Sequence, residues 1–143
     1  MIECKRILAV VDAERDNQPA LSRAYELASK TGATVTAMMV VYDLSYDMTT
    51  MLSPDVRESM RDAVTKEHAK WLSAQLKEQG FSETDIVVEW NNRAYESIIY
   101  FALNNQIDLV VKATKNHDDL ASVIFTPTDW HLMRKCPRPV LLV

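Results

Sequence analysis

The chain of 143 residues is long enough for one domain with an ordinary hydrophobic core. Hydrophobic residues make up 48% of it and charged residues 25%, with a net charge of −4, which is typical of a soluble globular protein and excludes a disordered or fibrous one. Its basic residues form no stripe, so we expect no direct nucleic-acid contact, and its apolar runs are too short to span a membrane.

The first third of the chain alternates between strand and helix patterns. Residues 7–11 are continuously apolar, which predicts a strand covered on both faces and ended by Asp12. A helix is expected over 19–32, beginning with proline and capped by glycine. A second strand is expected at 35–42. The segment 43–52 follows it as an irregular loop of unusual apolar content.

The same alternation continues to the end of the chain. Ser53 and Pro54 predict the start of a long helix, which Gly80 ends. Further strands are expected at 86–90, 109–111 and 139–143, and further helices at 95–103 and 126–135. This order predicts one α/β domain with an open, mostly parallel five-stranded sheet and helices on both faces.

Ligands of such sheets bind beyond the carboxyl ends of the strands. That rule makes Asp12, Val41, Lys112 and His117 the candidate ligand-binding residues. Asp12 is equally consistent with a structural acceptor in its loop. The segment 117–119 (His-Asp-Asp) resembles a metal or acid–base cluster only superficially, because no further ligands stand near it. We therefore expect no metal and no cofactor.

The scarcity of glycine limits what the cleft can hold. The chain has two glycines, Gly32 and Gly80, and both are expected to end helices. Phosphate-binding loops need glycine for close backbone approach and positive φ, so the Walker-type loop and the dinucleotide fingerprint are both excluded. At the last helix, Thr126 and Asp129 predict a capping box, and Pro127 contributes no N–H. The helix start thus offers few donors to a phosphate.

Three stretches, "RILAVVD", "VTAMMVVYD" and "LMRKCPRPVLLV", resemble the universal stress protein family. The resemblance covers essentially the whole chain, so residues 1–143 are expected to form one domain of this type. "YDLSYDMTTMLSPD", "VVEWNNR" and "VIFTPTDWHLMRKCPRPV" are more narrowly similar to the N-terminal half of a family member with two domains in tandem. The resemblance implies an adenine nucleotide alpha hydrolase-like fold with strand order 3-2-1-4-5. It also implies a dimer-forming last strand and a cytoplasmic stress-response role.

Nucleotide-binding members of that family carry the pattern Gly-x2-Gly-x9-Gly-Ser after the fourth strand. Counted back from the shared ending, its four positions fall on Ala113, Asn116, Thr126 and Pro127, and all four depart from the pattern. Asp12 and Val41 match positions that contact the adenosine part in those members. The resemblance therefore implies that the sugar-and-base side of the site persists while its phosphate side is lost.

Two surfaces are candidates for contacts with other molecules. Tyr46, Met48, Met51 and Leu52 are expected to form a lid over the carboxyl edge or an adhesive surface, unless their loop folds onto its own core. The last strand, Val140, Leu141, Leu142 and Val143, is apolar and lies at an edge. It predicts a homodimer or pairing with a second domain of the same type.

We conclude that the sequence favours a non-catalytic, cytoplasmic stress-response protein, with tolerance of DNA damage as one such role. Its cleft is expected to bind a small apolar or adenosine-like ligand, or a protein partner, and not ATP. Two alternatives stay open: a dimerising domain with a vestigial site, and a weak ATP switch that uses Lys112, Lys115 and His117. The chain is either a natural single domain or one half of a tandem protein.

Overall fold

The computed structural model describes residues 3–13, 15, 17–116 and 123–143, in which strands and helices alternate. Its strands are β1 (Arg6–Val10), β2 (Thr34–Val41), β3 (Asp85–Trp90), β4 (Leu109–Lys112), β5 (Lys115–Asn116), β6 (Val123–Ile124) and β7 (Val140–Leu142). Its helices are α1 (Pro19–Thr31), the 3-10 helix η1 (Leu44–Thr49), α2 (Pro54–Glu78), α3 (Ala94–Asn104) and α4 (Pro127–Lys135).

The main sheet has the order β3-β2-β1-β4-β7, and every neighbouring pair of strands is parallel. This confirms the expected order 3-2-1-4-5, with β7 as the fifth strand. Val10, the last residue of β1, stands opposite Met38 of β2 and Lys112 of β4. The strand order reverses between β1 and β4, so the carboxyl ends of β1, β2 and β4 surround the place where such sheets bind ligands.

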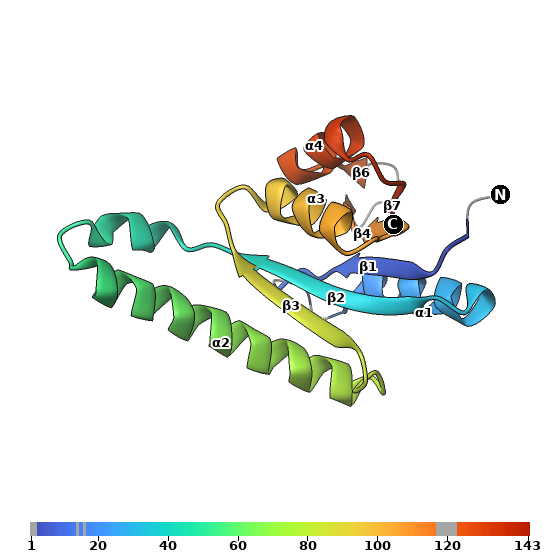
Figure 1. The fold of residues 1–143 in the computed structure, drawn as a ribbon, viewed down its shortest axis with the longest axis horizontal. Coiled ribbons are helices and arrows are strands. Elements are labelled where there is room, and N and C mark those ends of the chain that lie inside the picture. The colour runs from blue at the N-terminus through green and yellow to red at the C-terminus, as the bar shows by residue number, and fades with distance from the viewer. Residues whose placement is uncertain (1–2, 14, 16, 117–122) are drawn as a thin grey trace.

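Helices cover both faces of the sheet, as the apolar strand patterns predicted (Figure 1). Successive strand residues point to opposite faces. On one face, Ile7 and Ala9 of β1 belong to a core that includes residues of α1 and α2. On the other face, Leu8 and Val10 belong to a second core with residues of α3 and α4. This two-sided burial explains why residues 7–11 are all apolar.

Helix α2 begins where the sequence predicted but packs over only part of its length. The Ser53 hydroxyl accepts a hydrogen bond from the Val56 N–H at 3.4 Å, and Pro54 is the first helical residue. Leu72 and Leu76 are fully buried, whereas Val56 and Met60 are 47% and 40% exposed. The apolar residues spaced along α2, Val56, Met60, Val64, Leu72 and Leu76, predict one continuous buried stripe, and that prediction is wrong for the first half of the helix. The reason is geometric: that half of α2 extends beyond the carboxyl edge of the sheet, together with η1 (Figure 1).

Two connections contain structure that the sequence did not indicate. Within the segment expected to be an irregular loop, residues 44–49 form η1, which the Asp43 carboxylate caps by accepting the Ser45 N–H at 2.9 Å. After β4, the short strands β5 and β6 pair antiparallel, with Lys115 opposite Ile124. A six-residue 3-10 helix and two-residue strands carry too few residues to produce a periodic pattern.

Candidate ligand-binding pocket

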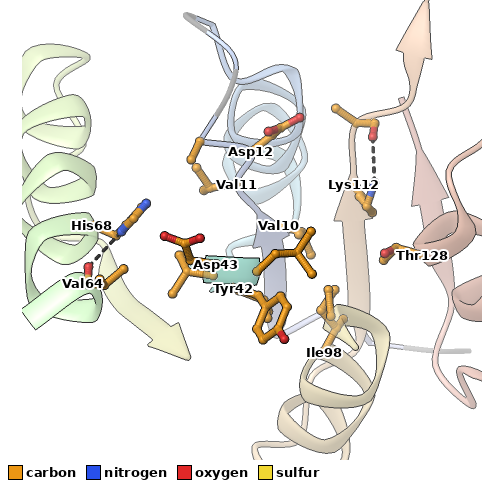
Figure 2. Close-up of a pocket in the computed structure, with 16 residues that line it drawn as sticks. Val10, Val11, Asp12, Tyr42, Asp43, Val64, His68, Ile98, Lys112 and Thr128 are labelled. Carbon is orange, nitrogen blue, oxygen red and sulfur yellow. Dashed lines mark hydrogen bonds between the residues drawn. The ribbon is translucent and has the colours of Figure 1, made fainter. Parts of the chain in front are cut away.

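A pocket of about 630 Å³ lies beyond the carboxyl ends of β1, β2 and β4 (Figure 2). Ligand pockets in proteins commonly have roughly 300–1,000 Å³. The lining comes from the ends of these strands, the loops after them, η1 and three α-helices: Val10, Val11, Asp12, Ala13, Val40, Val41, Tyr42, Asp43, Leu44, Val64, His68, Ala94, Ile98, Lys112, Ala113 and Thr128. Most of these side chains are apolar, and the polar ones stand at a few defined places around the wall.

The loop after β1 is held in place by the side chain of Gln18. Its amide nitrogen donates to the Asp12 carbonyl oxygen at 2.6 Å, and its amide oxygen accepts the Asp12 N–H at 3.0 Å. Gln18 is only 3% exposed, so these bonds are shielded from water. Arg15 adds a bond from its guanidinium to the Thr114 carbonyl at 2.9 Å, which ties the same loop to the segment after β4. Asp12 therefore sits at the pocket on a rigid backbone.

The end of β2 supplies an aromatic and an acidic side chain. Tyr42 packs edge-on against Trp90 of β3, with ring centroids 5.5 Å apart. Asp43 follows it, and Figure 2 shows its carboxylate beside Tyr42 on the side of the pocket that faces α2. Hydrogen bonds from Ser45, first from its backbone N–H, lower the pKa of Asp43. Asp43 thus stays ionised at neutral pH and adds a second negative charge to the wall.

Helix α2 contributes His68, a residue that the sequence did not assign to the site. Its Nδ1 lies 2.8 Å from the Val64 carbonyl oxygen (Figure 2). A carbonyl oxygen only accepts, so Nδ1 is the donor in this hydrogen bond. The side chain of this histidine is half-buried and hydrogen-bonded. Its place in the pocket could not be foreseen, because the position of α2 relative to the sheet edge is not encoded in local spacing.

At the opposite end of the pocket, Lys112 is engaged in an ion pair. Its Nζ lies 2.6 Å from Oδ1 of Asp129 and also donates to the Ala113 carbonyl oxygen at 3.2 Å. The Lys112 side chain is 15% exposed and that of Asp129 is fully buried. The lysine that could have attracted an anion is therefore neutralised by a residue of α4.

The start of α4 has the predicted capping box. Oδ2 of Asp129 accepts the Thr126 N–H at 2.8 Å, and the Thr126 hydroxyl accepts the Asp129 N–H at 3.2 Å. Pro127 is the first residue of the helix and has no N–H to offer. The donors at this helix end are thus mostly engaged within the chain.

The structure brings three of the four ligand-binding candidates together: Asp12, Val41 and Lys112 all line the pocket. His117 lies outside the described residues. Of the four positions matched to the glycine pattern, Ala113 lines the pocket and Thr126 caps α4. Pro127 begins that helix, and Asn116 lies in β5.

The four lid candidates do not line this pocket; of η1, only Leu44 does. Tyr46 packs against Trp90, with ring centroids 5.2 Å apart, and Arg57 lies over its ring at 4.6 Å. Met48 and Met51 are 84% and 95% exposed, and Leu52 is 44% exposed. Their role as a lid stays a prediction.

Strand β7 forms the outer edge of the sheet beside β4, as expected for the last strand. The Val143 N–H donates to the Lys112 carbonyl at 2.9 Å, and the Thr114 N–H donates to the Val143 carbonyl at 2.7 Å. Val140, Leu141, Leu142 and Val143 are all half-buried. Only β4 pairs with β7 among the described strands.

The described residues contain neither a cluster suited to a metal ion nor a helix suited to a membrane. No three histidine, cysteine, aspartate or glutamate side chains of this part of the chain are grouped so as to hold a metal ion. Nor does any of its helices combine the length and apolar character that crossing a bilayer requires.

Comparisons with known proteins agree on one family. The sequence model described as Universal stress protein family matches residues 3–143. Universal stress protein E of Escherichia coli (strain K12) is 45% identical over 141 residues, which are 97% of this chain and 45% of that protein. The chain thus spans about half the length of this relative.

Two solved structures share the fold. The universal stress protein UspA from Lactobacillus plantarum superposes with a TM-score of 0.74 at 21% identity, covering 100% of this chain and 99% of that one. A universal stress protein solved in complex with cAMP gives a TM-score of 0.60 at 14% identity, covering 99% and 98% of the two chains.

Proposed function

This chain belongs to the universal stress protein family, and we propose that it is a non-catalytic, cytoplasmic domain whose pocket binds a small neutral ligand rather than ATP. Membership of the family supports a stress-response role. Of the two neutral ligand classes that the sequence favours, apolar and adenosine-like, the pocket suits a nucleoside better because its wall carries polar groups beside the apolar ones.

The observation that carries this proposal is the distribution of polar groups around the pocket. Val10, Val41 and Ile98 offer apolar contact for a flat heterocycle. Asp12, Asp43 and His68 line the same pocket. Carboxylates accept hydrogen bonds from ribose hydroxyls. A nucleoside supplies both a flat apolar ring and hydroxyl donors, in a volume that this pocket accommodates.

The same wall disfavours a triphosphate. Lys112 is the one lysine or arginine among the described lining residues, and Asp129 neutralises it at 2.6 Å. Asp12 and Asp43 would repel a polyanion. These contacts also argue against a weak ATPase, because Lys115 is exposed in β5 and Lys112 is already engaged.

Ligand-dependent thermal unfolding tests the proposal. We expect adenosine to raise the Tm in a saturable way, and ATP and ADP to leave it unchanged. Cyclic AMP belongs in the panel because a structural relative was solved with it. Asp12→Ala should abolish the adenosine effect, whereas Asp85→Ala, an exposed acid at the amino end of β3, should preserve it. A Tm increase with ATP but not with adenosine would refute the proposal.

A second proposed role is assembly through β7. The observation that favours it is the position of an apolar strand at an edge of the sheet, where unpaired backbone groups invite another strand. The partner is a second copy of this chain, or a second domain of the kind that relatives of about twice this length have room for. Assembly and ligand binding use different parts of the fold and are compatible.

A further inference from the structure

We propose that the Asp129 carboxylate makes the contacts that a ligand's phosphate would otherwise make. Asp129 thereby sets the specificity of the pocket for neutral over phosphorylated ligands. The inference rests on the proposed function, since it assigns a ligand class to the same pocket. It concerns a residue that does not itself line the pocket but acts through one that does, Lys112.

The contacts of Asp129 are those that a bound phosphate would make at this place. A phosphate bound at a helix start accepts hydrogen bonds from backbone N–H groups and pairs with a nearby cation. Here the Thr126 N–H binds Oδ2 of Asp129 at 2.8 Å, and the Lys112 Nζ binds Oδ1 at 2.6 Å. Both partners of a potential ligand anion are therefore taken by an anion that belongs to the chain.

One donor of the first turn remains. The Thr128 N–H has no hydrogen-bond partner among the described residues, and Thr128 lines the pocket (Figure 2). Pro127 has no N–H, and the Asp129 N–H is bound by the Thr126 hydroxyl. A single free amide is too weak a site to overcome the charge of Asp129 beside it.

Burial strengthens this exclusion. Asp129 is fully buried and Lys112 is 15% exposed, so water and salt screen the pair poorly. A phosphate that approached Lys112 would meet the Asp129 carboxylate at close range. The other acids of the lining, Asp12 and Asp43, add to the repulsion.

Asp129→Asn isolates the charge from the shape of the side chain. The amide oxygen can still accept the Thr126 N–H, but the variant no longer neutralises Lys112. We expect the affinity for adenosine 5′-monophosphate, measured relative to that for adenosine, to rise about ten- to a hundredfold, the gain typical of hydrogen bonds to a charged group. The matched control is the double variant Lys112→Met/Asp129→Asn, which removes both charges and should gain nothing.

Isothermal titration calorimetry with adenosine, adenosine 5′-monophosphate and inorganic phosphate tests the inference on the wild type, the single variant and the double variant. The expected result is that the wild type prefers adenosine over its monophosphate by about tenfold or more. Only Asp129→Asn should bind inorganic phosphate. A single variant with the wild-type ratio of affinities, or a double variant that gains as much as the single one, would overturn it.

Two further outcomes are informative. Removing one partner of a buried pair can unfold a protein, so circular dichroism checks each variant, and Asp129→Ser replaces an unfolded Asp129→Asn. If neither variant folds, the test rests on the ratio of the wild-type affinities for adenosine and adenosine 5′-monophosphate. Equal affinities would refute the inference. If no form binds adenosine but the single variant alone binds inorganic phosphate, the proposed function fails and the role of Asp129 stands.

Discussion

Asp108 joins the segment before β4 to the start of β1, and its carboxylate responds to folding. Its Oδ2 accepts the Lys5 N–H at 2.8 Å and the Arg6 N–H at 3.0 Å. These two backbone hydrogen bonds lower the pKa of Asp108, Lys5 contributing most, and the positive charges of Arg138 and Lys5 add to the effect. The folded state thus favours the ionised carboxylate.

We expect this group to make stability depend on pH in the acid range. A lowered pKa contributes stability above the unfolded-state value of about 3.9, and the contribution is lost as the pH falls through the folded-state value. The urea midpoint of the wild type should exceed that of Asp108→Asn at pH 7, and the gap should close below pH of about 3.9. A gap that persisted unchanged at the lowest pH would show that the hydrogen bonds do not depend on ionisation.

Single residues of the site differ in how far their sequence context reveals them. Thr126 and Asp129 lie three positions apart at a helix start, so their mutual hydrogen bonds could be predicted. The pairing of Asp129 with Lys112 could not, because it depends on how α4 packs beside the end of β4. Gln18 was missed for the same reason: its bonds to Asp12 arise from the path of a loop.

At the scale of elements, α2 combines a buried half and an exposed half in one helix. Its start was predictable because Ser53 and Pro54 act locally. The division of α2 into an exposed and a buried half was not predictable, because the apolar spacing from Val56 to Leu76 continues past the point where the sheet ends. Similarly, the residues of η1 carried no periodic signal, although their apolar content indicated an unusual segment.

The two halves of α2 should respond differently to truncation. Leu72→Ala removes a fully buried side chain and should lower the free energy of unfolding by about 2–5 kcal/mol. Val56→Ala removes a side chain that is 47% exposed and should change it by less than about 0.5 kcal/mol. Urea denaturation measures both. Equal losses would mean that the first half of α2 is buried in solution.

Element η1 should affect ligand binding through one residue only. Leu44 lines the pocket, whereas Met48 is 84% exposed and does not. We therefore expect Leu44→Asp to weaken adenosine binding by about tenfold, the cost of roughly 1.4 kcal/mol of lost apolar contact, and Met48→Asp to leave it unchanged. Calorimetric titration distinguishes the two. A strong effect of Met48→Asp would instead support the lid that the sequence suggested.

At the scale of the whole molecule, the parallel sheet follows from the alternation of strand and helix patterns. The strand order came from the resemblance to the family, since alternation alone fixes neither the order nor the edge. The structure confirms the order and places β7 at an edge. Its position makes assembly testable without disturbing the pocket.

The backbone of β7 offers a selective way to block assembly. The Pro139 carbonyl and the Val143 N–H bond to β4, so alternation along the strand turns the N–H groups of Val140 and Leu142 outward. Leu142→Pro removes an outward donor while sparing the bonds to β4. Light scattering at tens of micromolar should show a wild-type dimer and a Leu142→Pro monomer. Val56→Ser, on the exposed half of α2, should remain a dimer. A monomeric wild type would contradict a homodimer through β7.

The most direct test of the whole account is a map of backbone amide chemical shifts during titration of the wild-type protein with adenosine and then with ATP. Adenosine should shift the amides of Val11, Asp12 and Tyr42 at the pocket and saturate. ATP should leave the amides of Thr126 and Thr128 unperturbed, because Asp129 and Lys112 already satisfy each other there. Saturable shifts of Thr126 and Thr128 with ATP but not with adenosine would contradict the account.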